Sequence, residues 1–304
     1  MLRFVLRRLF HAALTIFGVM LLTFLLFNLA AGDIAAQYTN PQRGEQGRHE
    51  WREKRGLNDP VLEQFGRHLW TSVTFQGKSY ATDEKLTDII VDRAKFSLAL
   101  TIPSLVLGWV LGMVISCFVA YWRDSWIDRF GVFLAVLGMC IPFLGYMILG
   151  QWVTFRVYPR AAWGLGSRAN IYLPIAIGVV AGLGRHVRFY RTIILDQVNQ
   201  DYVRTARAKG APLTTILFKH VIRNCMLPIL TSLVMAVPFL VMGNLLLEKF
   251  FGIPGLGDLL ISSVASRDVP IVTGLTFLTA VIYVVGLLVT DLLYAVFDPR
   301  IRLT

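Results

Sequence analysis

The chain has 304 residues, of which 55% are hydrophobic and only 16% are charged. Soluble chains carry about a quarter of their residues as charges. Here the charges lie between long apolar runs, which is typical of a protein that spans a bilayer. The net charge of +11 does not indicate a nucleic-acid partner, because much of the excess lies at the ends of those runs and can contact anionic lipid.

Six apolar runs approach the roughly 20 residues that a membrane-spanning helix needs. They cover residues 12–31, the stretch between Lys95 and Arg123, the stretch between Arg129 and Arg156, and residues 169–184, 224–247 and 269–290. The fourth run is short, and its Arg185 end would have to reach the membrane surface. The sequence therefore predicts an all-α integral membrane protein with six transmembrane helices, the first an uncleaved anchor longer than a signal peptide's apolar core.

The distribution of Lys and Arg predicts the orientation. If the N-terminus is cytoplasmic, the inside segments 1–11, 123–129, 185–223 and 291–304 carry 15 Lys and Arg, and the short outside loops 156–168 and 248–268 carry 5. Both termini are therefore expected to be cytoplasmic. The polar segment 32–95, with ten acids and ten bases, then becomes a periplasmic loop, and its residues 56–60 predict a turn before a helix.

The cytoplasmic segment 185–223 is too long and too regular for a simple connection. Gly210 stands where a helix would end in the left-handed conformation, and Pro212 suits the first turn of a following helix. The segment therefore predicts a helix, a sharp glycine turn and a second helix. A basic loop that binds anionic lipid is the alternative.

Residues 201–210, followed by Asn224, resemble the cytoplasmic signature of ABC importer permeases, and most closely the first permease subunit of the dipeptide, oligopeptide and nickel transporter family. Segments 56–64, 77–80, 248–257, 267–270, 291–294 and 298–300 also resemble that family. Three positions depart from the general pattern. Arg204 stands where a glutamate is usual, Arg223 stands where a proline is usual, and Gly286-Leu287 occupies the part of the last run where an asparagine is usual. The resemblance implies a type I ABC importer permease fold in the bacterial inner membrane.

The resemblance also implies a division of the chain and a set of site residues. The chain would divide into the N-terminal cytoplasmic end with the first transmembrane helix (1–31), the periplasmic loop (32–95), a five-helix permease core (96–296) with the coupling loop 185–223, and a cytoplasmic tail (297–304). In that family the loop forms a coupling helix that contacts the ATPase. The corresponding residues here are Asp201, Tyr202, Arg204, Ala206, Arg207, Lys209, Gly210 and Pro212.

The function implied is import of a small solute, foremost a di- or oligopeptide, by alternating access. Nickel chelate, glutathione, opine and oligosaccharide remain alternative cargoes. The implied partners are a second related permease subunit, two ATPase subunits or domains, a periplasmic or extracellular solute-binding protein, and membrane lipid. A homodimer also stays open. No cofactor is expected on this chain, and ATP and Mg²⁺ would bind the ATPase subunits, so the chain is not expected to be an enzyme.

Three other readings are disfavoured by the residues themselves. Gly77-Lys78-Ser79 is not a P-loop, because Ser72 stands where the first glycine should be. A secondary carrier would place acids, His or Lys in its spans, whereas the six runs contain none and the five histidines fall in ends or loops. The three cysteines are not spaced as a metal site or a disulfide framework.

The turn formed by Pro254, Gly255, Leu256 and Gly257 follows the fifth run on the outside. It predicts either an external gate element near the docked binding protein, carried by Pro254, Gly255 and Gly257, or a plain hairpin between two spans.

Overall fold

The computed structural model describes residues 2–30, 33–157, 171–242 and 244–297, and the regular structure of these residues is helical apart from one β-bridge between Lys78 and Lys85. The elements are α1 (Leu2–Ala30), α2 (Ile34–Tyr38), η1 (Pro41–Arg43), α3 (Gly44–Lys54), α4 (Val61–Thr74), α5 (Leu86–Tyr121), α6 (Trp126–Cys140), α7 (Phe143–Val157), α8 (Tyr172–Val198), α9 (Asp201–Ala208), α10 (Leu213–Thr215), η3 (Ile216–Val221), α11 (Ile222–Met242), α12 (Leu245–Phe251), α13 (Leu256–Ala265) and α14 (Val269–Phe297).

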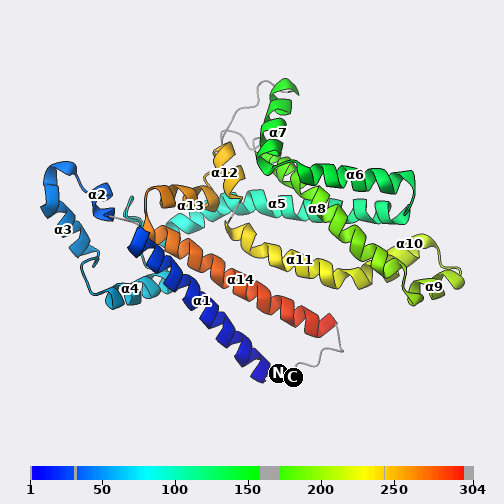
Figure 1. Cartoon of the computed structure of the whole chain (residues 1–304), viewed down its shortest axis with the longest axis horizontal. Helices are drawn as coiled ribbons and strands as arrows, with labels where there is room; N and C mark the ends of the chain where they lie inside the picture. The colour runs from blue at the N-terminus through cyan, green and yellow to red at the C-terminus, as the bar shows by residue number, and fades with distance from the viewer. Residues whose placement is uncertain (1, 31–32, 158–170, 243, 298–304) are drawn as a thin grey trace.

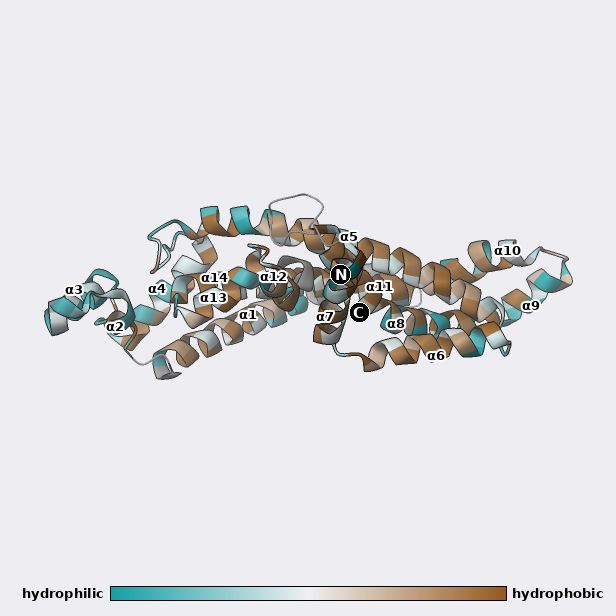
Figure 2. Ribbon diagram, turned by 90° about the horizontal axis from the view of Figure 1, so that it is seen from above, coloured by the Kyte–Doolittle hydropathy of each residue, from teal (hydrophilic) through white to brown (hydrophobic). Residues whose placement is uncertain are grey.

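The long helices form an elongated bundle (Figure 1). Helix α8 packs along α5 and α6, α11 packs on α14, and α1 lies against α14. The external helices α2 to α4 lie at one end of the long axis, and α9 and α10 lie at the other (Figures 1 and 2). Hydrophobic residues dominate the long helices between these two hydrophilic ends (Figure 2), which is the distribution that a bilayer requires.

The predicted all-helical membrane fold is confirmed, with about five to six apolar spans. Four described helical segments are long and apolar enough to cross a membrane: Leu6–Asn28, Leu86–Tyr121, Ile216–Val237 and Val269–Asp291. The bent pair formed by α6 and α7 counts as a fifth span if it crosses as one unit. The short fourth run lies at the start of α8, apart from residues 169–170, which are outside the described residues.

The third predicted span is not one continuous helix. Helices α6 and α7 meet at an angle of 100°, and Ile141 between them has extended backbone angles of −79° and 122°. Pro142 explains the break, because proline disfavours the helical conformation of the residue before it and cannot donate a backbone hydrogen bond. The apolar run was uninterrupted, so hydropathy alone did not reveal this bend.

Two helices are longer than their apolar runs. Helix α5 begins at Leu86, inside the segment predicted as periplasmic loop, and α8 continues through the first part of segment 185–223 to Val198. All five histidines lie in helices rather than in loops, and His11 and His220 fall within the segments Leu6–Asn28 and Ile216–Val237. His186 lies within α8, and its Nδ1 is 3.0 Å from the Tyr190 hydroxyl.

The beginning of α1 and the end of α14 lie on the same side of the molecule (Figure 1). Arg8 donates a hydrogen bond of 2.8 Å to Asp291, although the last residues of the tail, 298–304, are outside the described residues. This agrees with two termini on one side of the membrane. The basic segment around α9 lies at the end opposite the external helices, as the distribution of Lys and Arg predicted.

The external segment is folded and is tied to the loop before α14. The predicted turn is confirmed, because Gly56 has a φ of +63° and α4 follows at Val61. Asp268 is buried and accepts hydrogen bonds from the Ser79 hydroxyl (2.5 Å) and the Tyr80 amide (3.0 Å). Two external motifs nearly 190 positions apart in the sequence thus form one structural unit.

Candidate functional site

The helix, glycine turn and helix predicted for the cytoplasmic end are present. Helix α9 ends in a Schellman motif, in which the Gly210 amide donates to the Arg207 carbonyl (2.9 Å) and the Ala211 amide donates to the Ala206 carbonyl (3.1 Å). Gly210 has a φ of +73°. Pro212 lies just before α10, and its carbonyl accepts the amide of Ile216 (3.1 Å). We call residues 199–221 the cytoplasmic knob.

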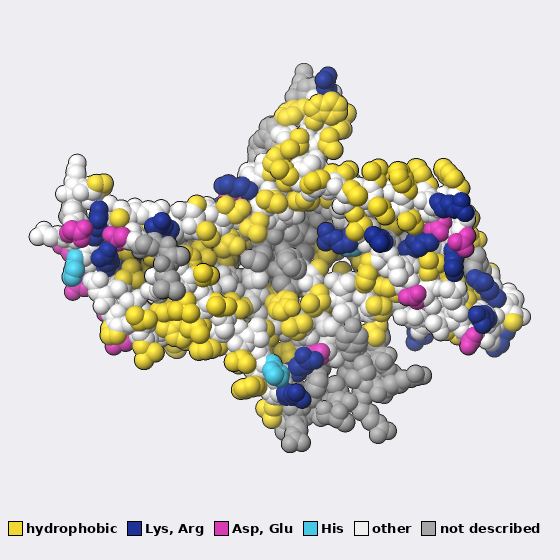
Figure 3. Space-filling view, viewed as in Figure 1, with side chains coloured by type: hydrophobic (Ala, Val, Ile, Leu, Met, Phe, Trp, Pro, Cys, Tyr) yellow, Lys and Arg dark blue, Asp and Glu magenta, His cyan; other side chains and the backbone are white. Residues whose placement is uncertain are grey.

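The predicted coupling residues form the exposed surface of this knob. The exposed members are Asp201, Arg204, Arg207, Lys209, Gly210 and Pro212, and the half-buried members are Tyr202 and Ala206. Lys and Arg side chains gather at this end of the molecule (Figure 3). The surface is therefore mainly cationic, and it suits an acidic protein groove or an anionic surface.

The opposite face of the knob is anchored in the bundle. Val203 is buried in an apolar cluster with Ile216, Leu217 and Val221 of η3 and with side chains of α5, α8 and α11. The Tyr202 hydroxyl also donates to the Gln197 side-chain carbonyl (2.9 Å). Because close-packed interiors transmit displacement rather than absorb it, a force on α9 reaches three long helices.

The sequence did not reveal the π-helix that follows the turn. Residues Ile216–Val221 form η3, a π-helical segment between α10 and α11, and such segments frequently occur at functional sites. Within η3 the Phe218 side chain is 68% exposed, whereas Ile216 and Val221 are buried. The Phe218 ring therefore lies on the outside of the knob. A π-helical turn has no recognisable sequence pattern, so the sequence did not predict it.

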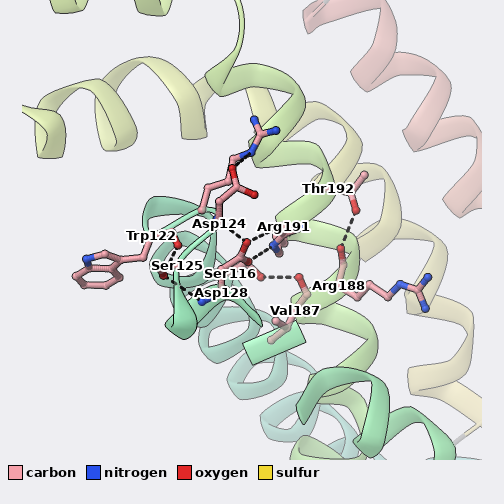
Figure 4. A network of polar contacts seen from close by, with 10 residues as sticks. Ser116, Trp122, Asp124, Ser125, Asp128, Val187, Arg188, Arg191 and Thr192 are labelled. Carbon is pink, nitrogen blue, oxygen red and sulfur yellow. Dashed lines mark hydrogen bonds and ion pairs between the residues drawn. The ribbon is translucent and has the colours of Figure 1, made fainter. Parts of the chain in front are cut away.

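A buried ion pair joins α6 to α8 next to the knob (Figure 4). Arg191 donates two hydrogen bonds of 2.7 Å to the two carboxylate oxygens of Asp128. Asp128 is 4% exposed and also accepts the Asp124 amide (3.0 Å). Close by, Ser116 of α5 donates to the carbonyl of Val187 on α8 (3.1 Å), so polar contacts link three helices at this end.

Asp128→Asn is expected to destabilise this end of the protein, because it leaves the half-buried guanidinium of Arg191 without its charge partner. Breaking a buried pair by removing one member costs about 3–5 kcal/mol. The thermal unfolding midpoint of the purified transport complex should therefore fall. The double variant Asp128→Leu/Arg191→Met should recover most of the loss, and equal destabilisation by the single and the double variant would contradict the proposed role of the pair.

On the outside, the glycine turn is held by a buried glutamate that the sequence analysis did not single out. Glu248 of α12 accepts hydrogen bonds from the Gly257 amide (2.7 Å) and the Asp258 amide (3.1 Å) at the beginning of α13. The Ser97 hydroxyl donates to its other carboxylate oxygen (2.7 Å) and accepts the Leu256 amide (2.7 Å). Burial raises the pKa of Glu248, and these hydrogen bonds oppose that shift.

Positions 255 and 257 of this turn have no room for a side chain, so both must be glycine. A Cβ atom on Gly255 would lie 2.3 Å from a Glu248 carboxylate oxygen and 2.5 Å from the Ser97 hydroxyl oxygen. A Cβ atom on Gly257 would lie 2.8 Å from the Cα of Leu245. Pro254 precedes them and is half-buried. The predicted gate residues are therefore brought together around one buried carboxylate, which packs α12 and α13 against α5.

Among the described residues, no group of three or more His, Cys, Asp or Glu side chains is arranged to hold a metal ion. The described residues form a rigid cationic knob on one side of a helical bundle and a tightly packed turn on the other. This arrangement is suited to transmitting movement between the two sides.

This architecture defines a membrane permease subunit, and comparison with known proteins identifies its family. Residues 112–303 match the family model described as binding-protein-dependent transport system inner membrane component, and residues 1–101 match its N-terminal companion model. The chain belongs to this family. It is a multi-pass permease subunit of an ABC importer in the inner membrane and has no catalytic role of its own.

Among its relatives are proteins described as glutathione transport system permease protein GsiC. Those of Escherichia coli K12, Shigella dysenteriae serotype 1 and Salmonella paratyphi A are each 34% identical to this chain over 304 residues. In each case 99% of this chain and 99% of the relative are covered. The predicted relationship to the first permease subunit of the peptide and nickel importers is confirmed.

Proposed function

We propose that this permease imports short peptides, with glutathione, a tripeptide, inside the size range that it accepts. The relatives described as glutathione permeases span the same full length, which supports a solute of this class. The six apolar runs contain no Asp, Glu, His, Lys or Arg, which favours recognition of backbone-type groups over recognition of a charge.

In this proposal, the cytoplasmic knob is the coupling element. It docks on a separate ATPase subunit, which binds ATP and Mg²⁺, and its cationic surface faces an acidic groove there. The observation that carries the proposal is the packing of Val203 and η3 in one buried apolar cluster with side chains of α5, α8 and α11. A short rigid element with two positions can transmit an ATPase movement, and a mobile linker cannot.

A second, related permease subunit and a second ATPase subunit complete the complex. Six spans enclose a path poorly, and a pair of subunits doubles that number. The solute-binding protein docks on the external side, near the turn that contains Gly255, and delivers the solute there. In this proposal the turn acts as an external gate element that moves with α12 and α13.

The proposed cargo is tested by uptake in a strain that lacks this transport system. Cells complemented with the intact system should accumulate labelled dipeptide and labelled glutathione, and unlabelled peptide should compete with both. A labelled oligosaccharide of similar mass is the matched control and should not enter. Accumulation of the oligosaccharide or of a nickel chelate, with no peptide uptake, would overturn the proposed cargo but not the family.

A further inference from the structure

The external end of the protein contains a cavity of about 640 Å³ that the transport cycle described above does not use. It lies between α1, α4, the segment around Tyr80 and the beginning of α14. This volume is within the range of small-molecule sites, about 300–1,000 Å³. The cavity has two chemically different walls, and this difference indicates what it binds.

One wall is apolar and comes from membrane-spanning helices. Phe24 and Phe27 of α1 and Val269 and Pro270 of α14 line it. On the same turns of α1, Leu22 and Leu26 are 63% and 65% exposed on the outer surface. Helix α1 therefore presents one face to the hydrocarbon region of the bilayer and another face to the cavity.

The other wall is cationic and comes from the external segment. Lys54, Arg55, Arg67 and Lys78 line it, together with one acid, Asp83. Lys78 is paired with Asp83 (3.6 Å), and Arg67 is paired with Asp59.

Among the described residues, Lys54 and Arg55 form no ion pair. The guanidinium of Arg55 lies over the ring of Trp51, 4.2 Å from its centroid, and near the ring of Tyr80. These contacts hold the charge at the cavity without neutralising it. Burial lowers the pKa of His68, another lining residue, to about 4, so this ring adds no charge at neutral pH.

The depth of the cavity matches the membrane surface. The apolar part of α1, Leu6–Asn28, has 23 residues, and at about 1.5 Å per residue its length is close to the thickness of the hydrocarbon region, about 30 Å. Asn28 then lies at the outer boundary, and Phe24 lies about 6 Å deeper. The cavity therefore extends from the acyl chains into the layer of the headgroups.

We propose that this cavity is a binding site for an anionic phospholipid of the outer leaflet, whose phosphate is held by Lys54 and Arg55 and whose acyl chain lies along Phe24 and Phe27. The bound lipid fills the gap between α1 and the external segment. It holds the external helices against the beginning of α14, to which Ser79 and Asp268 already tie them.

The test is performed on the intact transport complex with the full-length chain. The complex is placed in nanodiscs that contain equal amounts of phosphatidylglycerol and phosphatidylcholine, and the lipid retained after gentle detergent extraction is quantified by mass spectrometry. The wild type should retain phosphatidylglycerol in preference to phosphatidylcholine. Lys54→Gln/Arg55→Gln should lower that preference roughly thirtyfold, since two cations near the membrane surface together contribute about 2 kcal/mol.

Two further variants separate the site from general effects. Thr71→Trp fills the cavity without changing charge and should also reduce the retained phosphatidylglycerol. Lys95→Gln removes an exposed cation on α5 that is paired with Asp92 and does not line the cavity, so retention should stay at the wild-type level. Equal loss in the Lys95 variant, or no loss in the other two, would overturn the proposal.

A third arm distinguishes the lipid from a free anion or an acidic protein partner. In neutral nanodiscs, phosphatidylglycerol should raise the thermal unfolding midpoint of the wild-type complex, and inorganic phosphate should not. Equal protection by inorganic phosphate would show a free-anion site instead. If Lys54→Gln/Arg55→Gln lowered the affinity of the binding protein with lipid retention unchanged, the cations would be assigned to protein docking, and the lipid proposal would be wrong.

Discussion

Gly210→Val is expected to abolish ATP-driven uptake while the complex still inserts and assembles. Gly210 has a φ of +73°, and the left-handed conformation costs an L-residue roughly 1–2 kcal/mol, with a β-branched side chain at the unfavourable end. A Cβ atom at this position would meet no other atom within 4 Å. The effect is therefore backbone strain alone, and it should shift the turn that orients α9 relative to η3.

The measurement is ATPase activity and peptide uptake of the reconstituted complex, together with the amount of complex recovered. Gly210→Asn is the matched control, because asparagine tolerates the left-handed conformation, and it should retain most of the transport. Normal uptake by Gly210→Val would show that the turn is not the coupling element. A complex that fails to assemble in both variants would assign the glycine to assembly rather than to coupling.

Gly255→Leu is expected to block transport from the opposite side of the membrane. The new side chain would occupy the space of the Glu248 carboxylate and the Ser97 hydroxyl, which lie within 2.5 Å of the position of a Cβ atom. Glu248 would then lose its contacts with the beginning of α13. Each buried backbone amide left without a partner costs about 1–3 kcal/mol, which is enough to displace α12 and α13 from α5.

The expected result is a complex with ATPase activity that no longer responds to the loaded binding protein. Gly252→Asn is the matched control at the end of α12, where φ is +63° and a Cβ atom would meet nothing within 4 Å. Ser97→Ala removes only one hydroxyl and should show a smaller loss in the same direction. Unchanged uptake by Gly255→Leu at full expression would favour the plain hairpin.

The sequence predicted those parts of the fold that depend on local composition. Apolar runs located the spanning helices, the distribution of Lys and Arg predicted that α9 and the external helices lie at opposite ends, and the glycines at 56 and 210 marked turns. Each of these signals depends on a few neighbouring residues. The same is true of the exposed surface of the cytoplasmic knob, since the order of small and basic residues in α9 is local.

The parts that were missed depend on contacts between distant residues. Asp128 and Arg191 are 63 positions apart, and Ser97 and Glu248 are 151 positions apart, so one sequence gives no sign that they pair. Hydropathy does not reveal the bend at Pro142, because its flanking residues are as apolar as those of an intact span. The full lengths of α5 and α8 were missed because each helix continues past its apolar run into polar sequence, and hydropathy does not detect a helix there.

Contact between the cytoplasmic knob and the ATPase is the step on which the proposed function depends. A photo-crosslinking amino acid at position 208, an exposed residue at the end of α9, tests it in the intact complex, with position 264 on the external helix α13 as control. We expect an ATP-dependent adduct with the ATPase subunit at position 208 and none at position 264. An adduct with lipid alone at position 208, with the ATPase present in the complex, would contradict it.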